Sequence, residues 1–410
     1  MYQKPLFFLL LAFTCLQMDC HKPKEERDFL LYCKFRPGSI SVDHRNTLVV
    51  SDSQGNILKS FDIGGNEIEV QRTLKVDADV QTVNLHLGYR YDGSSPTQIY
   101  SYLEVQNGSL IVFEPYRFIT ENLSTQKVIR VDGIQTLDSM GFLGAPYFIP
   151  VSFTPGDTYA NVSAHFSPKQ GSVIHGKANG GSGYRYLYLP DSIMDSFTWD
   201  YYVSWNQFKP APAPTLVTTS SALPPVQEMN VDAVFPNFEH FTSIGPGMHI
   251  DPQHLSFIQP TGLPGVLRIQ LHGEHYLSEH LFQPGEPLHF DMTDMQIGDI
   301  SSTPGKGFKI ATSGDIDLLE VDCNESIYYA WKIEGKPSAF QDVTMPSIAD
   351  LSKYIAFPHE YASPFWRFTV KAHQFGKHNF DDIKEGFPPR SNDRFVAAKE
   401  GYFMLEKVFE

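Results

Sequence analysis

Turn-forming residues interrupt this chain every few positions, a spacing that suits short strands and turns better than helices. The 410 residues include 30 glycines and 29 prolines, scattered through the whole length. Between them lie runs rich in Phe, Tyr, Val and Ile, which favour strands. Because 41% of the residues are hydrophobic, the body has enough apolar surface to fold. The sequence therefore predicts an all-β protein with short helical turns.

Single segments alternate as half-buried strands do. In Gln81–Tyr91 (QTVNLHLGYRY) every second side chain from Val83 to Tyr89 is large and apolar, and the others are mostly polar. Thr47–Ser51 and Asn56–Phe61 flank the turn-forming sequence Asp-Ser-Gln-Gly and predict a hairpin. One apolar and one polar face per strand is typical of antiparallel sheets. We expect two or three tandem β-sandwich domains of immunoglobulin-like size.

Composition divides the body of the chain into three strand-rich segments. The first is 29–118, the second 119–226 and the third 227–410. The second ends in KPAPAPTLVTTSSALPPV (Lys209–Val226), where alternating prolines favour polyproline structure and block the hydrogen bonds of a sheet. This stretch is either a linker between domains or a long connection inside one, and we place a boundary after it.

The first residues have the layout of a secretion signal, predicted over 1–14. Lys4 gives a positive start, Leu6–Thr14 (LFFLLLAFT) is apolar, and Cys15 follows directly. The apolar run is shorter than the roughly 20 residues that cross a bilayer. A cysteine in this place resembles the lipobox of bacterial lipoproteins, in which the cysteine is acylated and becomes the N-terminus. Cys20 is the alternative acceptor, and an ordinary cleaved signal peptide is the other alternative.

The residues after the signal predict a flexible tether over 15–28. This stretch is polar and charged, so it has little apolar surface to bury. A charged tether after the acylated cysteine resembles the surface lipoproteins of Bacteroidetes-type bacteria. The resemblance is confined to the N-terminus and implies a lipid anchor in the outer membrane. A secreted or periplasmic location is the alternative.

Charge and motifs exclude several classes of function. The net charge of −15 repels phosphates, and no stripe of Lys and Arg offsets it, so we expect no binding of nucleic acid. No P-loop or dinucleotide fingerprint is present, and we expect no cofactor. Asn179–Gly183 (NGGSG) is not the G-x-S-x-G of a nucleophile elbow and predicts a turn. Carboxylates for glycoside hydrolysis cannot be singled out among 47 acidic residues.

The cysteines in the body leave two readings open. An oxidising compartment would allow a disulfide between Cys33 and Cys323. A buried free thiol is the alternative, which we favour for Cys323.

Histidines gather between His240 and His289, and His272, His275 and His280 are the metal-ligand candidates. Their spacing is not H-E-x-x-H, and a strand would place the first two on opposite faces. A chance surface cluster is the favoured alternative. Aspartates at 291–294 and 315–317 have oxygens that suit calcium but lack the EF-hand pattern, so solvated strand ends are the simpler reading.

The second segment holds the densest run of aromatic residues. The candidate ligand-binding residues are Tyr184, Tyr186, Trp199, Tyr202 and Trp205. They form either a stacking platform for sugar rings or part of a sandwich core, where large aromatic side chains dominate packing. Tyr202 falls on the polar face of its predicted strand, so we expect it to be exposed.

Together these features predict a lipid-anchored cell-envelope protein with a non-catalytic binding or structural role. Its expected partners are the membrane, through the anchor, and a glycan or other envelope proteins. The alternative is a secreted or surface carbohydrate-active enzyme on a β scaffold.

Overall fold

The computed structural model describes a set of ranges that covers most of the chain after the leader. These are residues 28–36, 46–64, 69–90, 97–113, 125–143, 148–166, 171–234, 241–243, 255–257, 259, 263, 266–283, 285–303, 307–325, 329–341, 343–355, 368–376, 380–385, 390–391, 394–395 and 401–409. The predicted signal and the acylation candidates Cys15 and Cys20 lie outside them. The prediction of an all-β chain with short helical turns is confirmed.

Seven strands form a sandwich at the N-terminal end of the described chain. They are β1 (Phe29–Phe35), β2 (Thr47–Ser51), β3 (Ile57–Asp62), β4 (Val70–Val76), β5 (Thr82–Arg90), β6 (Thr97–Gln106) and β7 (Leu110–Phe113). One layer has the order β4-β1-β7, and the other has β6-β5-β2-β3. Apolar side chains from both layers, Leu31 and Leu85 among them, form the core between the layers. The predicted hairpin is the antiparallel pair β2 and β3.

A second sandwich follows, with two four-stranded sheets. Its elements are β8 (Thr125–Asp132), β9 (Leu137–Leu143), β10 (Phe148–Ser152), β11 (Tyr159–Phe166), β12 (Ser172–Ala178), β13 (Arg185–Leu189), α2 (Asp191–Met194), β14 (Asp200–Ser204), η1 (Trp205–Gln207) and β15 (Lys209–Pro210). The sheet orders are β10-β11-β8-β14 and β15-β13-β12-β9. Ile129, Val162, Ile174 and Trp205 belong to the core between them.

The third segment contains the remaining elements. They are β16 (Thr215–Leu216), β17 (Thr218–Thr219), β18 (Glu228–Val234), β19 (Phe241–Ser243), β20 (Ser256–Phe257), β21 (Leu267–His272), β22 (Tyr276–Phe282), β23 (His289–Phe290), β24 (Gln296–Thr303), β25 (Gly307–Ser313), β26 (Leu318–Glu325), β27 (Tyr329–Gly335), η2 (Pro337–Phe340), β28 (Val343–Thr344), α3 (Ile348–Leu351), β29 (Phe368–Phe375), α4 (Phe380–Lys384), β30 (Arg390–Ser391), β31 (Arg394–Phe395) and β32 (Tyr402–Phe409). Within the described ranges, no helix is long and apolar enough to span a bilayer.

The first and third segments share one sheet of twelve strands. Its order is β19-β18-β21-β22-β32-β29-β26-β27-β6-β5-β2-β3. The joint is the parallel pair β27 and β6, which aligns Tyr329 with Thr97 and Glu334 with Tyr102. Backbone hydrogen bonds therefore connect the first and third segments, which local sequence patterns predict as separate domains. The proposed domain boundaries stay predictions.

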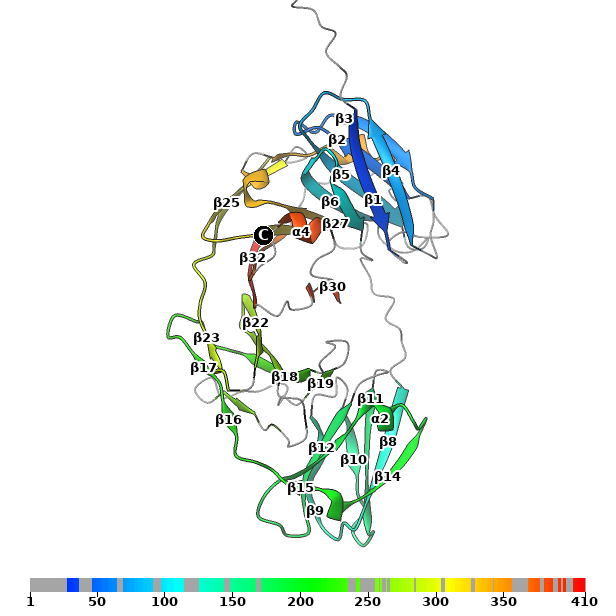
Figure 1. The fold of residues 1–410 in the computed structure, drawn as a ribbon, viewed down its shortest axis with the longest axis vertical. Coiled ribbons are helices and arrows are strands. Elements are labelled where there is room, and N and C mark those ends of the chain that lie inside the picture. The colour runs from blue at the N-terminus through cyan, green and yellow to red at the C-terminus, as the bar shows by residue number, and fades with distance from the viewer. Residues whose placement is uncertain are drawn as a thin grey trace, which may run out of the picture.

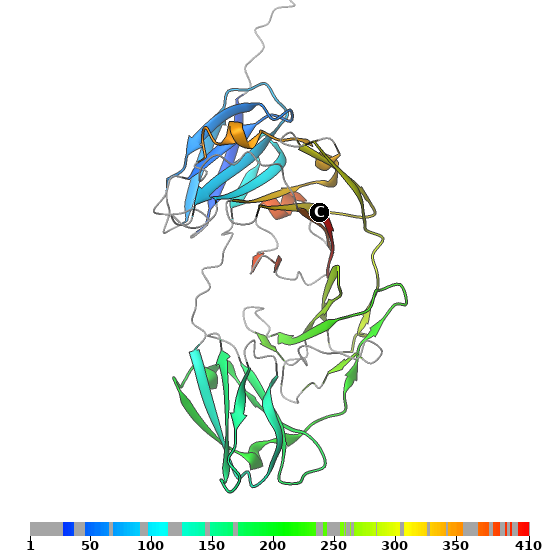
Figure 2. The ribbon, with the colours of Figure 1, turned by 180° about the vertical axis from the view of Figure 1, so that it is seen from behind.

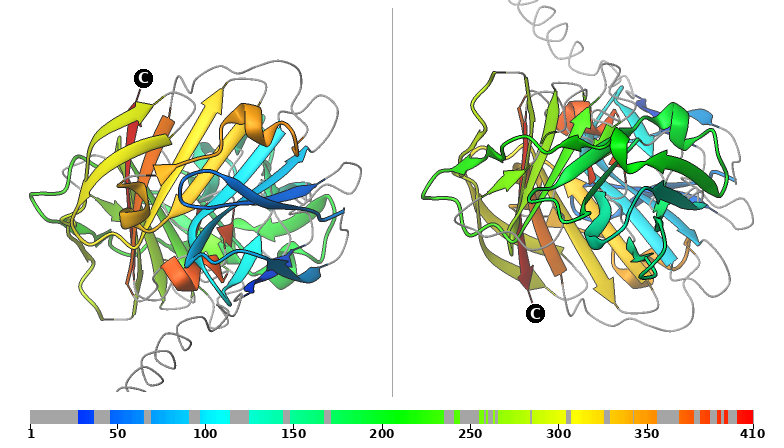
Figure 3. Two further views of the ribbon diagram at one scale, coloured as in Figure 1. Left: turned by 90° about the horizontal axis from the view of Figure 1, so that it is seen from above. Right: turned by 90° about the horizontal axis from the view of Figure 1, so that it is seen from below.

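The two sandwiches lie at opposite ends of the long axis, and strands of the third segment run between them (Figure 1). Figure 2 shows the same arrangement from behind. Along the long axis the strands of the large sheet fan out (Figure 3), in keeping with the twist of β-sheets. The Pro-rich stretch connects the second sandwich to the third segment. Its strand β15 pairs with β13 of the second sandwich, whereas β16 and β17 pair with β20 and β23 of the third segment.

A chain of buried polar side chains crosses the joint of the twelve-stranded sheet. Ser51 Oγ lies 3.0 Å from His86 Nε2, and His86 Nδ1 lies 2.8 Å from Ser101 Oγ. The indole Nε1 of Trp331 donates to the same Ser101 Oγ over 2.8 Å. The four residues come from β2, β5, β6 and β27 and are all buried. Burial lowers the pKa of His86 to about 3, so its imidazole is neutral.

The two cysteines of the described chain are free and buried. Cys33 lies in the core of the first sandwich and Cys323 in the core of the third segment, so the disulfide considered between them does not form. Burial raises the pKa of the Cys33 thiol to about 12 and also raises that of Cys323.

Candidate functional site

The five aromatic candidates divide into exposed and buried residues. Trp199, Tyr202 and Tyr184 expose 68%, 60% and 47% of their surface. Trp205 and Tyr186 are buried. Trp205 packs on Phe208 with ring centroids 4.7 Å apart, inside the second sandwich. The expectation that Tyr202 is exposed is confirmed.

Tyr202 belongs to a row of side chains that crosses three strands of one sheet. It pairs in register with Arg130 on β8, and β8 pairs with β11, which carries Tyr159. The guanidinium carbon of Arg130 lies 3.6 Å from the centre of the Tyr159 ring and 5.7 Å from that of Tyr202. Such a cation over aromatic faces is held by the quadrupole of the rings. We call these three residues the Tyr202–Arg130–Tyr159 row.

The strand alternation explains why the row faces outward. In β8, Ile129 and Val131 are fully buried in the core, so Arg130 between them must point to the other face. In β14, Val203 is buried and Tyr202 points away from it. Asp132, also on β8, accepts a hydrogen bond of 3.1 Å from Arg130 Nε, which fixes the guanidinium plane.

Trp199 directly precedes β14, the terminal strand in its sheet order. Its backbone carbonyl accepts a hydrogen bond of 2.6 Å from the amide of Val128, which ties the chain to β8 just before Tyr202. Tyr184 lies elsewhere, beside β13 in the opposite sheet, with its ring 5.9 Å from that of His175. The structure therefore places Trp199 directly before the strand that carries Tyr202 and leaves Tyr184 apart.

Sequence reasoning missed Arg130 and Tyr159. The alternation in Thr125–Asp132 already places Arg130 opposite two apolar residues, which is a local signal. The parallel pairing of β14 with β8 gives no such local signal, because most of the residues of the sandwich lie between these two strands in the sequence.

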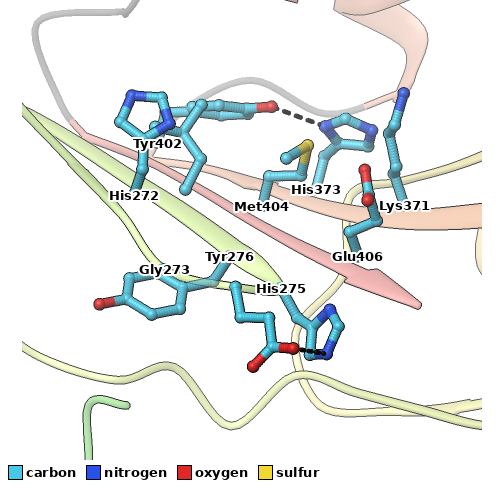
Figure 4. Close-up of a pocket in the computed structure, with 11 residues that line it drawn as sticks. His272, Gly273, His275, Tyr276, Lys371, His373, Tyr402, Met404 and Glu406 are labelled. Carbon is cyan, nitrogen blue, oxygen red and sulfur yellow. Dashed lines mark hydrogen bonds and ion pairs between the residues drawn. The ribbon is translucent and has the colours of Figure 1, made fainter. Parts of the chain in front are cut away.

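The histidine candidates lie near the turn between β21 and β22 but do not converge. His272 and His275 border one pocket, which has a volume of about 280 Å³ (Figure 4). His280 points to the opposite face, where its ring packs 5.0 Å from Phe290. Burial lowers the pKa of His280, partly offset by Asp291. Across the described ranges, no group of three His, Cys, Asp or Glu side chains is placed to hold a metal ion.

The aspartates considered as calcium ligands accept hydrogen bonds from backbone amides. Asp294 Oδ1 accepts a hydrogen bond of 3.3 Å from the amide of Asp315. Asp317 Oδ2 accepts one of 2.8 Å from the amide of Phe375. These carboxylates stabilise neighbouring strand ends.

The floor of the pocket at the β21–β22 turn comes from β29 and β32. The hydroxyl of Tyr402 lies 2.9 Å from His373 Nδ1, which fixes both rings. Lys371 lies 3.1 Å from Glu320 and 2.6 Å from Asp322. Burial lowers the pKa of Lys371, but these two carboxylates raise it more, so the ammonium stays charged.

Comparison with known proteins gives no functional assignment. No protein-family model matches the sequence, and no curated protein matches it. Among solved structures, the crystal structure of the N-terminal four Ig domains of Dscam1 isoform 4.4 is similar at 8% identity and a TM-score of 0.13. That match covers 84% of this chain and 96% of that one.

Proposed function

We propose that this chain is a lipid-anchored cell-envelope protein with a non-catalytic role, and that it binds a glycan on the Tyr202–Arg130–Tyr159 row. The observation that carries the proposal is the exposure of Tyr202, 60%, on the outer face of a sheet beside a stacked guanidinium. The layout of the first 28 residues supports the location.

The row offers what a sugar ring needs. Exposed aromatic rings present flat apolar faces, which cover the C–H faces of a sugar, and the tyrosine hydroxyls remain available at the ring edge. Arg130 and its partner Asp132 place donors and acceptors of hydrogen bonds next to these faces. Tyr202 is exposed in β14 and Trp199 is exposed directly before this strand, so a sugar chain would reach Trp199 only if it extended past the beginning of β14.

Replacing Tyr202 by Ala is expected to weaken glycan binding at least tenfold, or about 1.4 kcal/mol, because a stacking face is lost. The measurement is a glycan array with the wild type, followed by titration of the best ligand. Tyr184→Ala is the matched control, since it removes an exposed tyrosine from the opposite sheet. Equal affinities for wild type and Tyr202→Ala would contradict the proposal.

The non-catalytic role has its own test. Incubation with polysaccharides should release no reducing sugar above background. Release that a single Asp or Glu substitution abolishes would show an enzyme instead.

The anchor is tested by labelling cells with a palmitate analogue. The variant Cys15→Ala should lose the label and leave the membrane fraction, because no acyl acceptor remains at the lipobox position. The variant Cys20→Ala should keep both properties. Label that persists in Cys15→Ala would overturn the assignment of this cysteine.

A further inference from the structure

We propose that the pocket at the β21–β22 turn binds a small organic cation, a primary amine on a ring or chain no larger than one hexose. The pocket lies on the twelve-stranded sheet, whereas the Tyr202–Arg130–Tyr159 row lies on the second sandwich. The two proposals therefore stand on different surfaces and different residues.

The pocket is walled by three strands and one turn. β22 pairs with β32, β32 pairs with β29, and the turn between β21 and β22 closes one side. Figure 4 shows His272, Tyr402 and His373 along one side of this wall, with Tyr276 and His275 on the other. Backbone hydrogen bonding holds the turn in place, since the amide of Glu406 donates to the carbonyl of His275 over 2.7 Å. The walls thus come from rigid elements.

Size limits the ligand. A volume of about 280 Å³ lies just below the usual range for pockets that take drug-sized molecules, which begins at roughly 300 Å³. A single ring with one or two substituents is the class that fits.

Aromatic rings in the pocket favour a cation. Tyr402 and Tyr276 both line it, from opposite faces of the sheet, and Met404 and Leu277 supply apolar surface on the same face as Tyr402. The hydrogen bond between His373 Nδ1 and the Tyr402 hydroxyl holds that ring in one orientation. An ammonium group near the face of a fixed tyrosine is stabilised by the ring quadrupole.

The charges around the pocket also favour a cation. Lys371 and Lys332 are matched by Glu320 and Asp322, with contacts of 3.3 Å from Lys332 to Glu320 and 2.6 Å from Lys371 to Asp322. This group of two cations and two anions is balanced within itself.

Two further carboxylates remain at the pocket. Glu406 aligns with Lys371 in the strand register, and Glu274 lies in the turn, 3.8 Å from His275. Because the ammonium of Lys371 is already held by Glu320 and Asp322, Glu406 leaves the pocket with negative charge. The pocket therefore suits a ligand that brings a positive charge and hydrogen-bond donors.

The test uses two probes that share a ring and differ in charge, cyclohexylamine and cyclohexanol. The amine is protonated near neutral pH, as lysine is. Titration of the full chain by NMR should give a dissociation constant for cyclohexylamine at least tenfold lower than for cyclohexanol. Added salt should weaken only the binding of the amine.

Variants locate the site. Glu406→Gln should weaken amine binding at least fivefold, and Glu274→Gln, which changes an exposed side chain and leaves the fold intact, should weaken it in the same direction. Glu385→Gln, an exposed change in the turn directly after α4, and Tyr202→Ala should both leave it unchanged. Equal affinity for the two probes, no binding of either, or unchanged binding in both pocket variants would overturn the proposal, whatever the outcome for glycans.

Discussion

Replacing Trp331 by Ala is expected to lower the free energy of unfolding by about 3–5 kcal/mol. Trp331 is 2% exposed and lies on β27, at the joint between the first and third segments. Its removal leaves a large cavity and also takes away the donor to Ser101 Oγ, at 2.8 Å. His86 Nδ1 still lies 2.8 Å from this hydroxyl, so we expect the lost packing of the indole ring to account for most of the cost. Urea denaturation followed by circular dichroism measures it.

The matched control is Trp199→Ala, which deletes the same side chain at a position that is 68% exposed. It should change stability by no more than about 0.5 kcal/mol. If both variants lower the free energy of unfolding by the same amount, the burial of Trp331 at the joint between β6 and β27 does not stabilise the protein as we expect.

Acid is expected to destabilise the protein through His86, by about 4–5 kcal/mol between its unfolded and folded pKa values. Burial lowers the pKa of His86 from 6.5 to about 3. Between these values the unfolded chain binds a proton that the folded chain does not. Stability is therefore fully present above pH 6.5 and is lost progressively as the pH falls, until the loss levels off near pH 3.

The measurement is the free energy of unfolding in urea, at about pH 7 and about pH 4, for wild type and His86→Gln. In the wild type, His86 should account for roughly 3 kcal/mol of the fall between these two pH values. The variant removes the titrating ring, so its stability should fall less over this range. Carboxylates titrate in both proteins and cancel in the comparison. His275→Gln, which changes an exposed ring, should keep the wild-type dependence. An identical fall in wild type and His86→Gln would contradict the neutral, buried state of His86.

Local patterns predicted much of the fold. The hairpin over 47–62 and the strand that begins near Val83 follow from alternation and turn residues, which act over a few positions. The pairing of Glu334 with Tyr102 could not be predicted, because it depends on packing between residues that are far apart in sequence. For the same reason, the sequence did not show that the first and third segments share a sheet.

The candidate site was predicted in part. The polar face of the strand around Tyr202 marked this residue as exposed, and the structure confirms it. Trp205 has the same aromatic character but is buried, since it lies in the turn that follows β14 and folds into the core. That Arg130 and Tyr159 lie beside Tyr202 was learned only from the order of the strands in the sheet. Composition identifies which residues are aromatic, and tertiary structure decides which of them face solvent.

Hydrogen–deuterium exchange, with and without the best ligand from the glycan array, tests the central claim most directly. Binding on the Tyr202–Arg130–Tyr159 row should slow exchange of amides in β14 and in the loop that enters it, because a ligand on this terminal strand shields and stiffens it. Amides of the first sandwich should exchange unchanged. Protection confined to the first sandwich or to the β21–β22 turn, with β14 unaffected, would contradict the account.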